Sequence, residues 1–257
     1  MIKIFIAMHK PDDLVLLAPK EMYEPIHCGK ALYIPNETKG FLPELNDNTG
    51  DNISVKNKMY SELTGLYWIW KNYKCDPNDI VGLSHYRRYF SEPNSDNMKF
   101  ITKETIEKYL QECDFLTAGI GTEYDFTTPD MQSAYEVYCQ CHNKKDMDNC
   151  LKAVKIVRPD IGNIIEDQIK HSACICLQNM FITKKKHLDE YCEFLFPVLD
   201  KTLEFTNLSD PYYQDYNGRF PGFLGERLLR PWLIATGHSA IGVGSLDWEK
   251  YSGYVWV

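Results

Sequence analysis

Short apolar runs alternate with longer amphipathic segments along most of this chain. Residues 3–8 and 80–84 are brief runs rich in aliphatic side chains, and such runs are typical of buried strands. Residues 61–72 carry apolar side chains at helical spacing and predict an amphipathic helix. Because strands alternate with helices, the pattern predicts an α/β fold with a mostly parallel sheet flanked by helices.

The same patterns predict most of the remaining elements. Helices are expected over residues 102–112, 130–141, 145–157, 184–203 and 225–236, and strands over 114–118 and 172–183. Pro197 is expected to kink or divide the helix 184–203, because proline cannot donate the helical hydrogen bond. The strand 172–183 is expected to bend at residues 178–179. Residues 12–57 are rich in Pro, Gly and Asn and predict mostly loop.

The length and composition indicate one globular domain. The chain has 257 residues, of which 44% are hydrophobic and 25% charged, and these are ordinary fractions for a soluble protein. It has no low-complexity linker and no internal repeat, so a single domain over residues 1–257 is expected. No apolar run approaches the ~20 residues that a membrane span requires, and residues 1–8 are too few for a secretory signal. We therefore expect a cytoplasmic protein.

The net charge and the cysteines argue against some classes of function. A net charge of −8 at pH 7 argues against a general nucleic-acid binder, which would be basic. The nine cysteines form no C-x-x-C pair, so the spacing typical of zinc ribbons and redox sites is missing. Cys139, Cys141 and His142 could share a metal, but their spacing differs from that of structural metal sites. Reduced cysteines are the simpler interpretation.

The segment 80–90 carries the most informative chemistry. Its apolar strand ends in His85, Tyr86, Arg87 and Arg88. In open α/β sheets, ligands bind beyond the carboxyl ends of the strands. Two guanidinium groups at such a position suit a phosphate or a carboxylate, because arginine offers planar bidentate donors and keeps its charge. The alternative is that the arginines are surface charges and the tyrosines only pack.

Four segments together resemble a known bacterial family. They are NISVKNKMYSELTGLYWIWKN (52–72), VGLSHYRRYF (81–90), CLQNMFITKKKHLDEYCEFLF (176–196) and FPGFLGERLLRPWL (220–233). The family has been catalogued as a domain of unknown function, and its members occur in capsular-polysaccharide, exopolysaccharide and O-antigen gene clusters. The resemblance extends from about Lys3 to His238.

This resemblance implies a fold and an activity. Members of the family are regarded as glycosyltransferases, which implies a GT-A-like nucleotide-diphospho-sugar transferase fold. The expected reaction moves a hexose from a nucleotide-diphosphate sugar to a surface-polysaccharide or lipid-linked glycan acceptor. A UDP-sugar is the expected donor, and UDP-galactose in its furanose or pyranose form fits on family grounds. A sugar-nucleotide hydrolase and a non-catalytic binding subunit of polysaccharide assembly are the alternatives.

The arginine pair stands where many GT-A enzymes have an acidic motif. Those enzymes hold a divalent metal with an Asp-x-Asp at the end of a mid-chain strand, and the metal neutralises the departing diphosphate. The comparable strand here ends without a carboxylate pair. We therefore expect Arg87 and Arg88, with His85, to stabilise the leaving group without a metal or other cofactor. The alternative is a Mn²⁺ or Mg²⁺ ion held by His85 and a distant carboxylate.

Glu226 is the expected catalytic base for the acceptor hydroxyl. An inverting transferase needs a carboxylate or a histidine within hydrogen-bond reach of that hydroxyl. Glu226 follows residues 222–225 at the predicted start of a helix, and in the GT-A enzymes that the chain resembles an acidic residue at a late helix start often has this role. It could instead only complement the helix dipole. Asp130 and Glu62 are reserve candidates, and a retaining mechanism needs no such base.

Eight further residues are candidates for donor binding. They are His9, Lys10, Glu62, Thr64, Trp68, Tyr86, Asn179 and Arg227. His9 and Lys10 follow the first strand, where they could meet a nucleotide base or a phosphate. The others could bind hydroxyl groups, rings or phosphates of the donor. The alternatives are solvent-exposed charges, a turn-forming Asn and aromatic side chains that pack in the core.

Lys184, Lys185 and Lys186 form a basic run at a predicted helix start. Such a run could approach anionic lipid headgroups, which would suit a lipid-linked acceptor at the inner face of the cytoplasmic membrane. Three lysines at a helix start are also typical of an ordinary solvated face. Peripheral membrane contact is therefore an expectation that the positions of these side chains can test.

Overall fold

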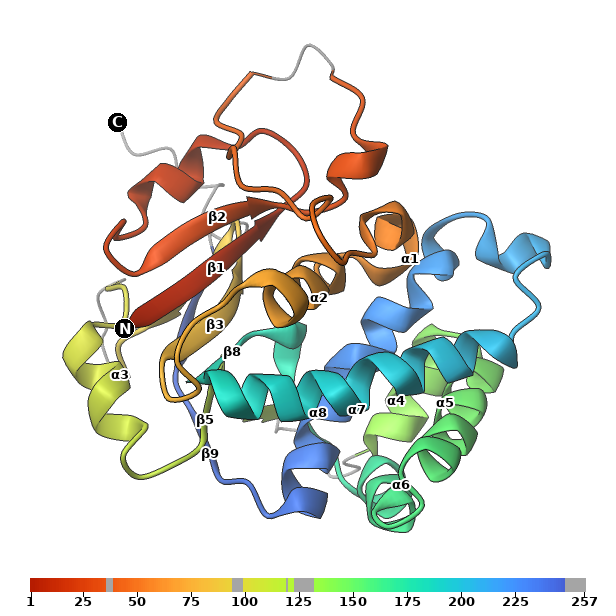
Figure 1. Cartoon of the computed structure of the whole chain (residues 1–257). Helices are drawn as coiled ribbons and strands as arrows, with labels where there is room; N and C mark the ends of the chain where they lie inside the picture. Colours follow the sequence, from red (N-terminus) through yellow and green to blue (C-terminus); the bar gives the residue numbers. More distant parts are fainter. Residues whose placement is uncertain (36–38, 94–98, 119, 123–131, 248–257) are drawn as a thin grey trace.

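The computed structural model describes residues 1–35, 39–93, 99–118, 120–122 and 132–247. Within these residues the centre of the molecule is a mixed sheet with helices on both faces (Figure 1). Its strands are β1 (Ile2–Met8), β2 (Tyr23–His27), β3 (Ile80–His85), β4 (Arg88–Ser91), β5 (Phe115–Thr117), β8 (Phe181–Lys184), β9 (Ala240–Gly242) and β10 (Gly244–Asp247). A separate small sheet pairs β6 (Ile120–Thr122) with β7 (Cys174–Cys176).

The strand directions in the central sheet are mixed. β1 lies between β2 and β3, and these three strands run parallel. β8 runs antiparallel to β3 and β5, while β9 runs parallel to β5. β4 follows β3 through a tight hairpin and pairs with β10, and so short a connection can join only antiparallel strands. The predicted α/β class with helices around a sheet is confirmed, but the expectation of a mostly parallel sheet was wrong.

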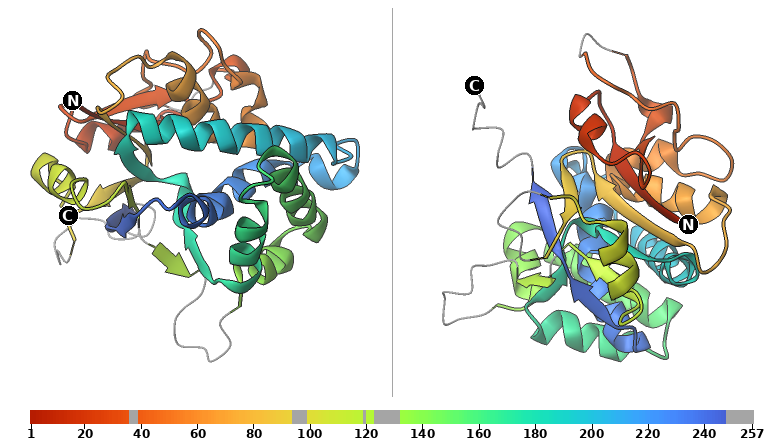
Figure 2. Two further views of the ribbon diagram at one scale, coloured as in Figure 1. Left: turned by 60° about the horizontal axis from the view of Figure 1, so that its bottom comes forward. Right: turned by 90° about the vertical axis from the view of Figure 1, so that its left-hand side faces the viewer.

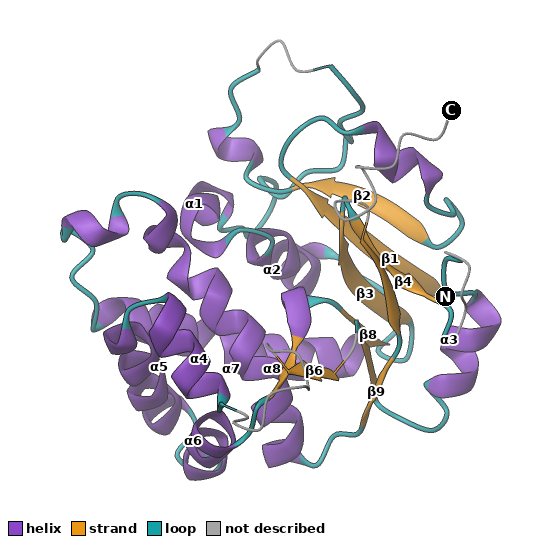
Figure 3. Ribbon diagram, turned by 180° about the vertical axis from the view of Figure 1, so that it is seen from behind, coloured by secondary structure: helices purple, strands orange, loops and turns teal. Residues whose placement is uncertain are grey.

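The helices occupy most of the predicted places. They are α1 (Asn57–Tyr60), α2 (Leu63–Asn72), α3 (Lys103–Tyr109), α4 (Ala134–Cys141), α5 (Lys144–Val157), α6 (Gly162–His171), α7 (Lys185–Glu204) and α8 (Phe220–Thr236). Figure 3 shows that α4, α5 and α6 gather on the side of the molecule away from β1 and β2. The sequence patterns missed α6, and they missed β2 inside the predicted loop. None of the described helices is long and apolar enough to cross a lipid bilayer.

The central sheet separates two apolar cores, and β1 contributes to both. Phe5 and Ala7 face the larger core, with side chains from α2, α5, α7 and α8. Ile4 and Ile6 face the smaller core, with side chains from α3 and β4. Successive side chains of a strand point to opposite faces, so a strand covered on both sides is apolar at nearly every position. This explains the unbroken apolar run at residues 3–8.

Pro197 was expected to kink or divide the helix, and since α7 is one continuous helix the division was wrong (Figure 2). Proline removes one helical hydrogen bond and disturbs the preceding turn. Core packing on both sides of it compensates here, because Phe194 and Leu195 before the proline and Val198 and Leu199 after it are buried.

The predicted strand 172–183 is two strands separated by a turn. β7 ends at Cys176 and β8 begins at Phe181. Between them Gln178 has φ 65° and Asn179 has φ 54°, and neither value is compatible with extended backbone. The expected bend at residues 178–179 is therefore a complete break of the strand.

The lysine run at the start of α7 does not form one exposed group. Lys185 is buried, and its ammonium pairs with Asp189 one turn further along α7. Its backbone N–H donates to the carbonyl of Asp79 at 2.8 Å. The expectation that three adjacent lysines face lipid headgroups was therefore wrong for the middle one. All nine cysteines are free thiols, as expected.

Gly82 allows β3 and β8 to lie in close contact. A Cβ atom at this position would lie 2.8 Å from the Phe181 carbonyl oxygen and 3.0 Å from the Ile182 side chain. Gly82→Ala is therefore expected to lower the free energy of unfolding by about 1–3 kcal/mol, because a backbone oxygen must move. Urea denaturation followed by circular dichroism measures this change.

Gly237→Ala provides the control for this prediction. Gly237 has φ 75°, and no other atom lies within 4 Å of the position that a Cβ would take. Alanine there therefore introduces backbone strain without a steric clash. Its expected cost is about 1 kcal/mol. A Gly82→Ala variant as stable as the parent would contradict the close packing of β3 on β8.

Candidate functional site

A cleft of about 960 Å³ opens at the carboxyl ends of β1, β2 and β3. Its walls include Met8 and His9 at the end of β1, Cys28 after β2, and His85 at the end of β3. β2 and β3 flank β1 on opposite sides, so the path of the chain across the sheet reverses at β1. Open α/β sheets bind their ligands at such a point, in the crevice beyond the strand ends. The cleft is therefore the candidate functional site.

Close packing brings the start of α2 to the strand ends. A Cβ atom on Gly65 would lie 2.6 Å from the Cys28 sulfur, so only glycine lets the helix approach this closely. Glu62, directly before α2, consequently lies in the wall of the cleft. On the facing side Arg219 also lines the cleft, and its Nε donates to Ser61 Oγ at 3.1 Å.

Cationic side chains outnumber carboxylates on the described lining of the cleft. The charged lining residues are Lys58, Arg87, Arg88 and Arg219 with positive charge, and Glu62 and Asp215 with negative charge. This balance favours an anionic ligand although the whole chain is acidic. The three guanidinium groups also offer the paired N–H donors that match phosphate oxygens.

The turn from β3 to β4 presents the predicted His-Tyr-Arg-Arg group to the cleft. His85 and Arg88 pair across the turn, and the N–H of Tyr86 donates to a backbone carbonyl of β1. The Arg87 guanidinium lies 5.0 Å from the centre of the Tyr86 ring, and its Nε donates to Asp12 Oδ2 at 3.3 Å. All four predicted residues line the cleft.

His9 lines the cleft beside this turn, whereas Lys10 does not. The His9 ring meets Tyr86 edge-on, with 5.5 Å between the ring centres. Burial among the surrounding protein atoms, together with the charges of Lys10 and Arg219, lowers the pKa of His9. A neutral His9 can both donate and accept a hydrogen bond. The ammonium of Lys10 lies 5.7 Å from the centre of the Tyr86 ring.

Asn179 and Gln178 fix the orientation of two side chains in the cleft wall. The Asn179 amide donates to Glu62 Oε1 at 2.6 Å and to the Gly222 carbonyl at 3.3 Å. The carbonyl of Gln178 accepts a 2.6 Å hydrogen bond from His85 Nε2. Asn179 is only 3% exposed and does not line the cleft, so it fits a positioning role better than the predicted contact with a donor sugar.

Unusual backbone conformations gather around this site. Ser61, Gln178 and Asn179 are the non-glycine residues with positive φ in the described part of the chain. Ser61 lines the cleft, Gln178 holds His85, and Asn179 holds Glu62. Such conformations cost about 1–3 kcal/mol each and persist where the surrounding structure requires them, which is most common at functional sites.

Glu226 does not line the cleft, but the charges of Glu62, Arg88 and Arg219 act on its carboxyl group, whose pKa is strongly raised. Burial raises the pKa of Glu226 most, and repulsion from the Glu62 carboxylate raises it further. The positive charges of Arg88 and Arg219 lower it, and the net effect is a pKa of about 8. Its side chain keeps 26% of its surface exposed, and Oε2 accepts from Arg227 Nη1 at 3.2 Å. A carboxyl group with this pKa can exchange protons near neutral pH.

The place of Glu226 in α8 differs from the sequence expectation. α8 begins at Phe220, with Pro221 in its first turn, so Glu226 lies in the second turn and not at the helix start. Gly225, the residue before Glu226, allows close packing, because a Cβ there would lie 3.0 Å from Asn179 Oδ1.

Glu62→Gln is expected to lower the pKa of the Glu226 carboxyl. Burial and the charge of Glu62 both raise that pKa, and glutamine keeps the shape of the side chain while it removes the charge. Carboxyl-carbon NMR titration of the two proteins measures the pKa directly. Glu44→Gln, which changes an acidic side chain outside the cleft lining, is the control and should leave the titration unchanged. An unchanged or higher pKa in Glu62→Gln would contradict the electrostatic coupling.

The chain is similar to a known protein family and to a solved structure. A family model described as "Domain of unknown function (DUF4422)" matches residues 3–237. The chain belongs to this family. No curated protein matches it. Among solved structures it is similar to one described as the bifunctional glycosyltransferase WbbM in its apo form, with a TM-score of 0.78 and 24% sequence identity over 96% of this chain and 45% of that one.

Membership of the DUF4422 family agrees with the resemblance seen in the sequence, and the likeness to WbbM confirms the fold. The chain spans less than half of the WbbM chain. All the residues that line the cleft belong to this chain.

Besides Lys10 and Asn179, three more predicted donor contacts lie outside the cleft lining of this DUF4422 chain. Thr64 is fully buried and bonds to the Ser61 carbonyl at 3.1 Å. Trp68 donates from Nε1 to Thr49 Oγ1 at 2.9 Å. Arg227 is 5% exposed and donates to a carbonyl of its own helix at 2.9 Å. None of the three residues lines the cleft, so the structure does not support a contact with a donor there.

Arg219 is the main lining residue that the sequence analysis missed. It ends the short 3-10 helix Tyr216–Arg219, directly before α8. Its guanidinium lies 5.6 Å from the centres of both the Tyr216 and Phe223 rings. The signal was an arginine immediately ahead of the family segment 220–233, but only the fold shows that it faces the β3–β4 turn.

The described lining of the cleft does not provide a three-ligand metal site. Its histidines and carboxylates do not bring three ligand atoms close enough to share one ion, as far as the described residues extend. Cys139, Cys141 and His142 do not form such a group either, and His142 stacks on Phe223 with ring centres 4.4 Å apart. Asp130, the reserve candidate for the base, lies outside the described residues.

Proposed function

We propose that this protein is a glycosyltransferase that moves a hexose from a UDP-sugar to a glycan acceptor. The observation that carries the proposal is the group of three arginines that line the cleft beyond the strand ends together with Glu62. Glu226 lies outside this lining but is coupled by charge to Glu62, Arg88 and Arg219, and its pKa is raised to about 8. The name of WbbM describes a glycosyltransferase, and its fold is shared over 96% of this chain. The proposal concerns one transferase unit.

The cleft has a suitable size and position for such a donor. Ligand sites usually enclose about 300–1,000 Å³, and this cleft encloses about 960 Å³. We assign the nucleoside end of the donor to the wall formed by His9 and Tyr86, which offers an aromatic ring and a neutral imidazole. The diphosphate then extends toward the arginines.

Arg87, Arg88 and Arg219 are assigned to the leaving diphosphate. As the bond between the sugar C1 and the phosphate oxygen breaks, negative charge grows on that oxygen. Guanidinium groups that are already in place stabilise this charge without reorganisation. The His-Tyr-Arg-Arg turn is held by backbone pairing and Arg219 by Ser61, so these donors are well positioned. We propose that they replace the metal ion of the Asp-x-Asp enzymes.

Glu226 is assigned to the acceptor hydroxyl. Its ionised carboxylate takes the hydroxyl proton while the acceptor oxygen forms its bond to C1 and the diphosphate leaves from the opposite face. This step inverts the configuration at C1. A base with a pKa of about 8 is partly ionised at neutral pH and has strong proton affinity, which suits this task. Glu62, held by Asn179, is assigned to a sugar hydroxyl as a hydrogen-bond acceptor.

A transfer assay with a panel of UDP-sugars tests the proposal. The panel includes UDP-galactose in both ring forms, with synthetic lipid-linked glycans as acceptors, and mass spectrometry detects the product while a coupled assay detects UDP. We expect an extended glycan and stoichiometric UDP. A chelator should leave the initial rate unchanged, and added Mn²⁺ or Mg²⁺ should not raise it.

The same assay separates the alternatives. Free sugar and UDP released equally with and without acceptor would indicate a sugar-nucleotide hydrolase. Tight UDP-sugar binding without turnover for every donor and acceptor would indicate a binding subunit. Absence of binding for all nucleotide sugars would overturn the donor-site assignment itself.

A further inference from the structure

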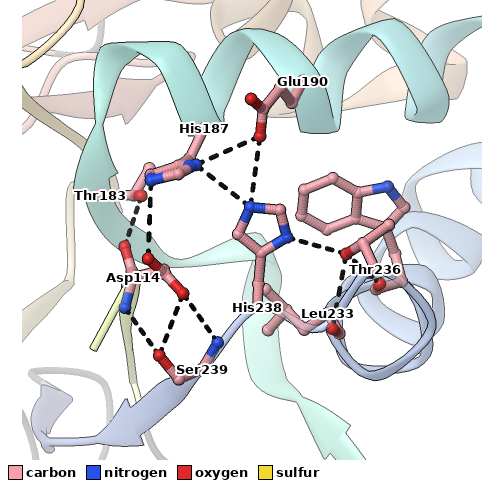
Figure 4. A network of polar contacts seen from close by, with 9 residues as sticks. Asp114, Thr183, His187, Glu190, Leu233, Thr236, His238 and Ser239 are labelled. Carbon is pink, nitrogen blue, oxygen red and sulfur yellow. Dashed lines mark hydrogen bonds and ion pairs between the residues drawn. The ribbon is translucent and has the colours of Figure 1, made fainter. Parts of the chain in front are cut away.

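A second cluster of ligand-type side chains lies at the opposite end of the sheet from the cleft. His187 and Glu190 project from one face of α7, and His238 follows α8 directly after Gly237 (Figure 4). α7 begins at the end of β8 that pairs with Ile80, whereas the cleft lies at the His85 end of β3. β3 spans about 17 Å between these ends. The cluster is therefore separate from the proposed donor site.

Three ligand atoms of this cluster meet in an almost regular triangle. His187 Nδ1 and His238 Nε2 lie 3.1 Å apart. Each of them lies 3.2 Å from Glu190 Oε2. In a tetrahedral zinc site with bonds of about 2.0–2.1 Å, neighbouring ligand atoms are separated by about 3.3 Å. The triangle thus matches one face of such a tetrahedron.

Hydrogen bonds set the tautomer of His238. Thr236 Oγ1 donates to the Trp232 carbonyl at 2.7 Å, which uses the single hydroxyl proton. The same oxygen lies 2.8 Å from His238 Nδ1, so it accepts a proton from that nitrogen (Figure 4). In the neutral ring, Nε2 then carries a lone pair that points toward Glu190.

Asp114 favours the matching tautomer of His187 by its charge, because the two groups are too far apart for a hydrogen bond. Its Oδ1 lies 3.6 Å from His187 Nε2, while Oδ2 accepts from the N–H and the hydroxyl of Ser239, both at 3.0 Å. A proton on Nε2 faces this carboxylate, which leaves the lone pair of the neutral ring on Nδ1. A carboxylate behind a ligating histidine is the common outer-shell arrangement in metal sites.

The two imidazoles and Glu190 therefore direct three electron pairs at one point. With both rings neutral in these tautomers, the three lone pairs repel one another unless a proton or a metal ion lies between them. A divalent ion at this point would be coordinated by all three groups. The side chains are also supported, because Trp232 stacks on His238 with ring centres 4.9 Å apart at 16°. His187 and His238 are 13% and 15% exposed, whereas Glu190 is 51% exposed and leaves an open approach.

We propose that His187, Glu190 and His238 bind a zinc ion, with a fourth coordination position open to water. Two imidazoles and one carboxylate at this spacing fit zinc better than Mg²⁺ or Ca²⁺, which prefer oxygen ligands in larger number. The ion joins α7 to the segment that leads into β9. It stabilises the β5–β9 side of the sheet, far from the proposed transfer reaction, and does not depend on that reaction.

Metal binding by the purified chain tests this site. The protein is freed of metal with a chelator, and Zn²⁺ is added during isothermal titration calorimetry and thermal unfolding. We expect one zinc ion per chain and a higher Tm, since an ion that binds only the folded state stabilises it. Co²⁺ in place of zinc should give the visible absorption of a tetrahedral site. Absence of stoichiometric binding to the parent chain would overturn the proposal.

Variants locate the ion within the chain. Glu190→Gln changes a half-exposed side chain and should keep the fold, yet it should weaken zinc binding at least about 10-fold. His187→Ala should remove binding. His171→Ala is the matched control, because His171 pairs with Asp167 on an exposed helix face and should not matter. Equal zinc affinity in the parent, Glu190→Gln and His187→Ala would show that the cluster is only a hydrogen-bonded network.

Discussion

Glu226→Gln is expected to lower kcat for sugar transfer about 10²–10⁴-fold while it leaves the affinity for UDP nearly unchanged. Glutamine keeps the size of the side chain but cannot accept the proton of the acceptor hydroxyl. The arginines that bind the diphosphate remain in place. In the parent protein the rate should increase as pH rises through about 8, because the ionised form of Glu226 is the base. That pH dependence should disappear in the residual activity of the variant.

The same substitution is expected to stabilise the fold at alkaline pH. Burial and the charge of Glu62 raise the pKa of Glu226 from 4.5 to about 8, so between these values the folded chain binds more protons than the unfolded chain. Its free energy of unfolding therefore falls as pH rises through this range. A shift of one pKa unit corresponds to about 1.4 kcal/mol, so the loss of unfolding free energy at pH 9 is at most about 5 kcal/mol. Glutamine does not ionise and escapes this loss.

Thermal unfolding at pH 5 and pH 9 measures the effect on stability. The Tm of Glu226→Gln should exceed that of the parent by more at pH 9 than at pH 5. Glu193→Gln, on the exposed side of α7, is the control and should show no such difference. A variant that is inactive and also destabilised at pH 9 would mean that the substitution disrupts α8. Full activity in Glu226→Gln would remove the base assignment.

The sequence predicted the strand ends better than the rest of the sheet. The run 80–84 followed by His85, Tyr86, Arg87 and Arg88 carries both signals locally, an apolar strand and a sudden cluster of polar groups. The structure places this cluster in the cleft. β2 was missed because Pro25 interrupts its pattern. Among the described strands β2 pairs with β1, and on its other side an isolated bridge joins His27 to Asn46, so Pro25 lies near the edge of the sheet, where proline is tolerated.

The details that escaped prediction depend on contacts between distant segments. Asn179 appeared as a turn residue, and only the approach of α8 and α2 shows that it holds Glu62. The pKa of Glu226 depends mainly on burial and on Glu62, which is 164 positions earlier in the sequence. His187 and His238 form no local motif, so their convergence on Glu190 needed the packing of α7 against the end of α8.

Arg88→Ala is expected to weaken UDP binding about 10- to 100-fold and to lower kcat by about 10²–10³. Arg88 lines the cleft directly after the β3–β4 turn, where its guanidinium can meet the charge on the leaving diphosphate. Arg88→Lys keeps the charge but loses the paired donors, so it should restore binding more than turnover. Arg158→Ala, which removes a surface arginine paired with Asp160, is the control for loss of one positive charge.

A second readout distinguishes a direct role of Arg88 from a general loss of structure. Burial and Glu62 raise the pKa of Glu226, and Arg88 opposes them, so removal of Arg88 should shift the pH dependence of the remaining activity to higher pH. Isothermal titration with UDP and the pH–rate profile measure the two effects in one preparation. If UDP affinity and the profile both match those of Arg158→Ala, the diphosphate does not bind at the β3–β4 turn, and the proposed metal-independent mechanism fails with it.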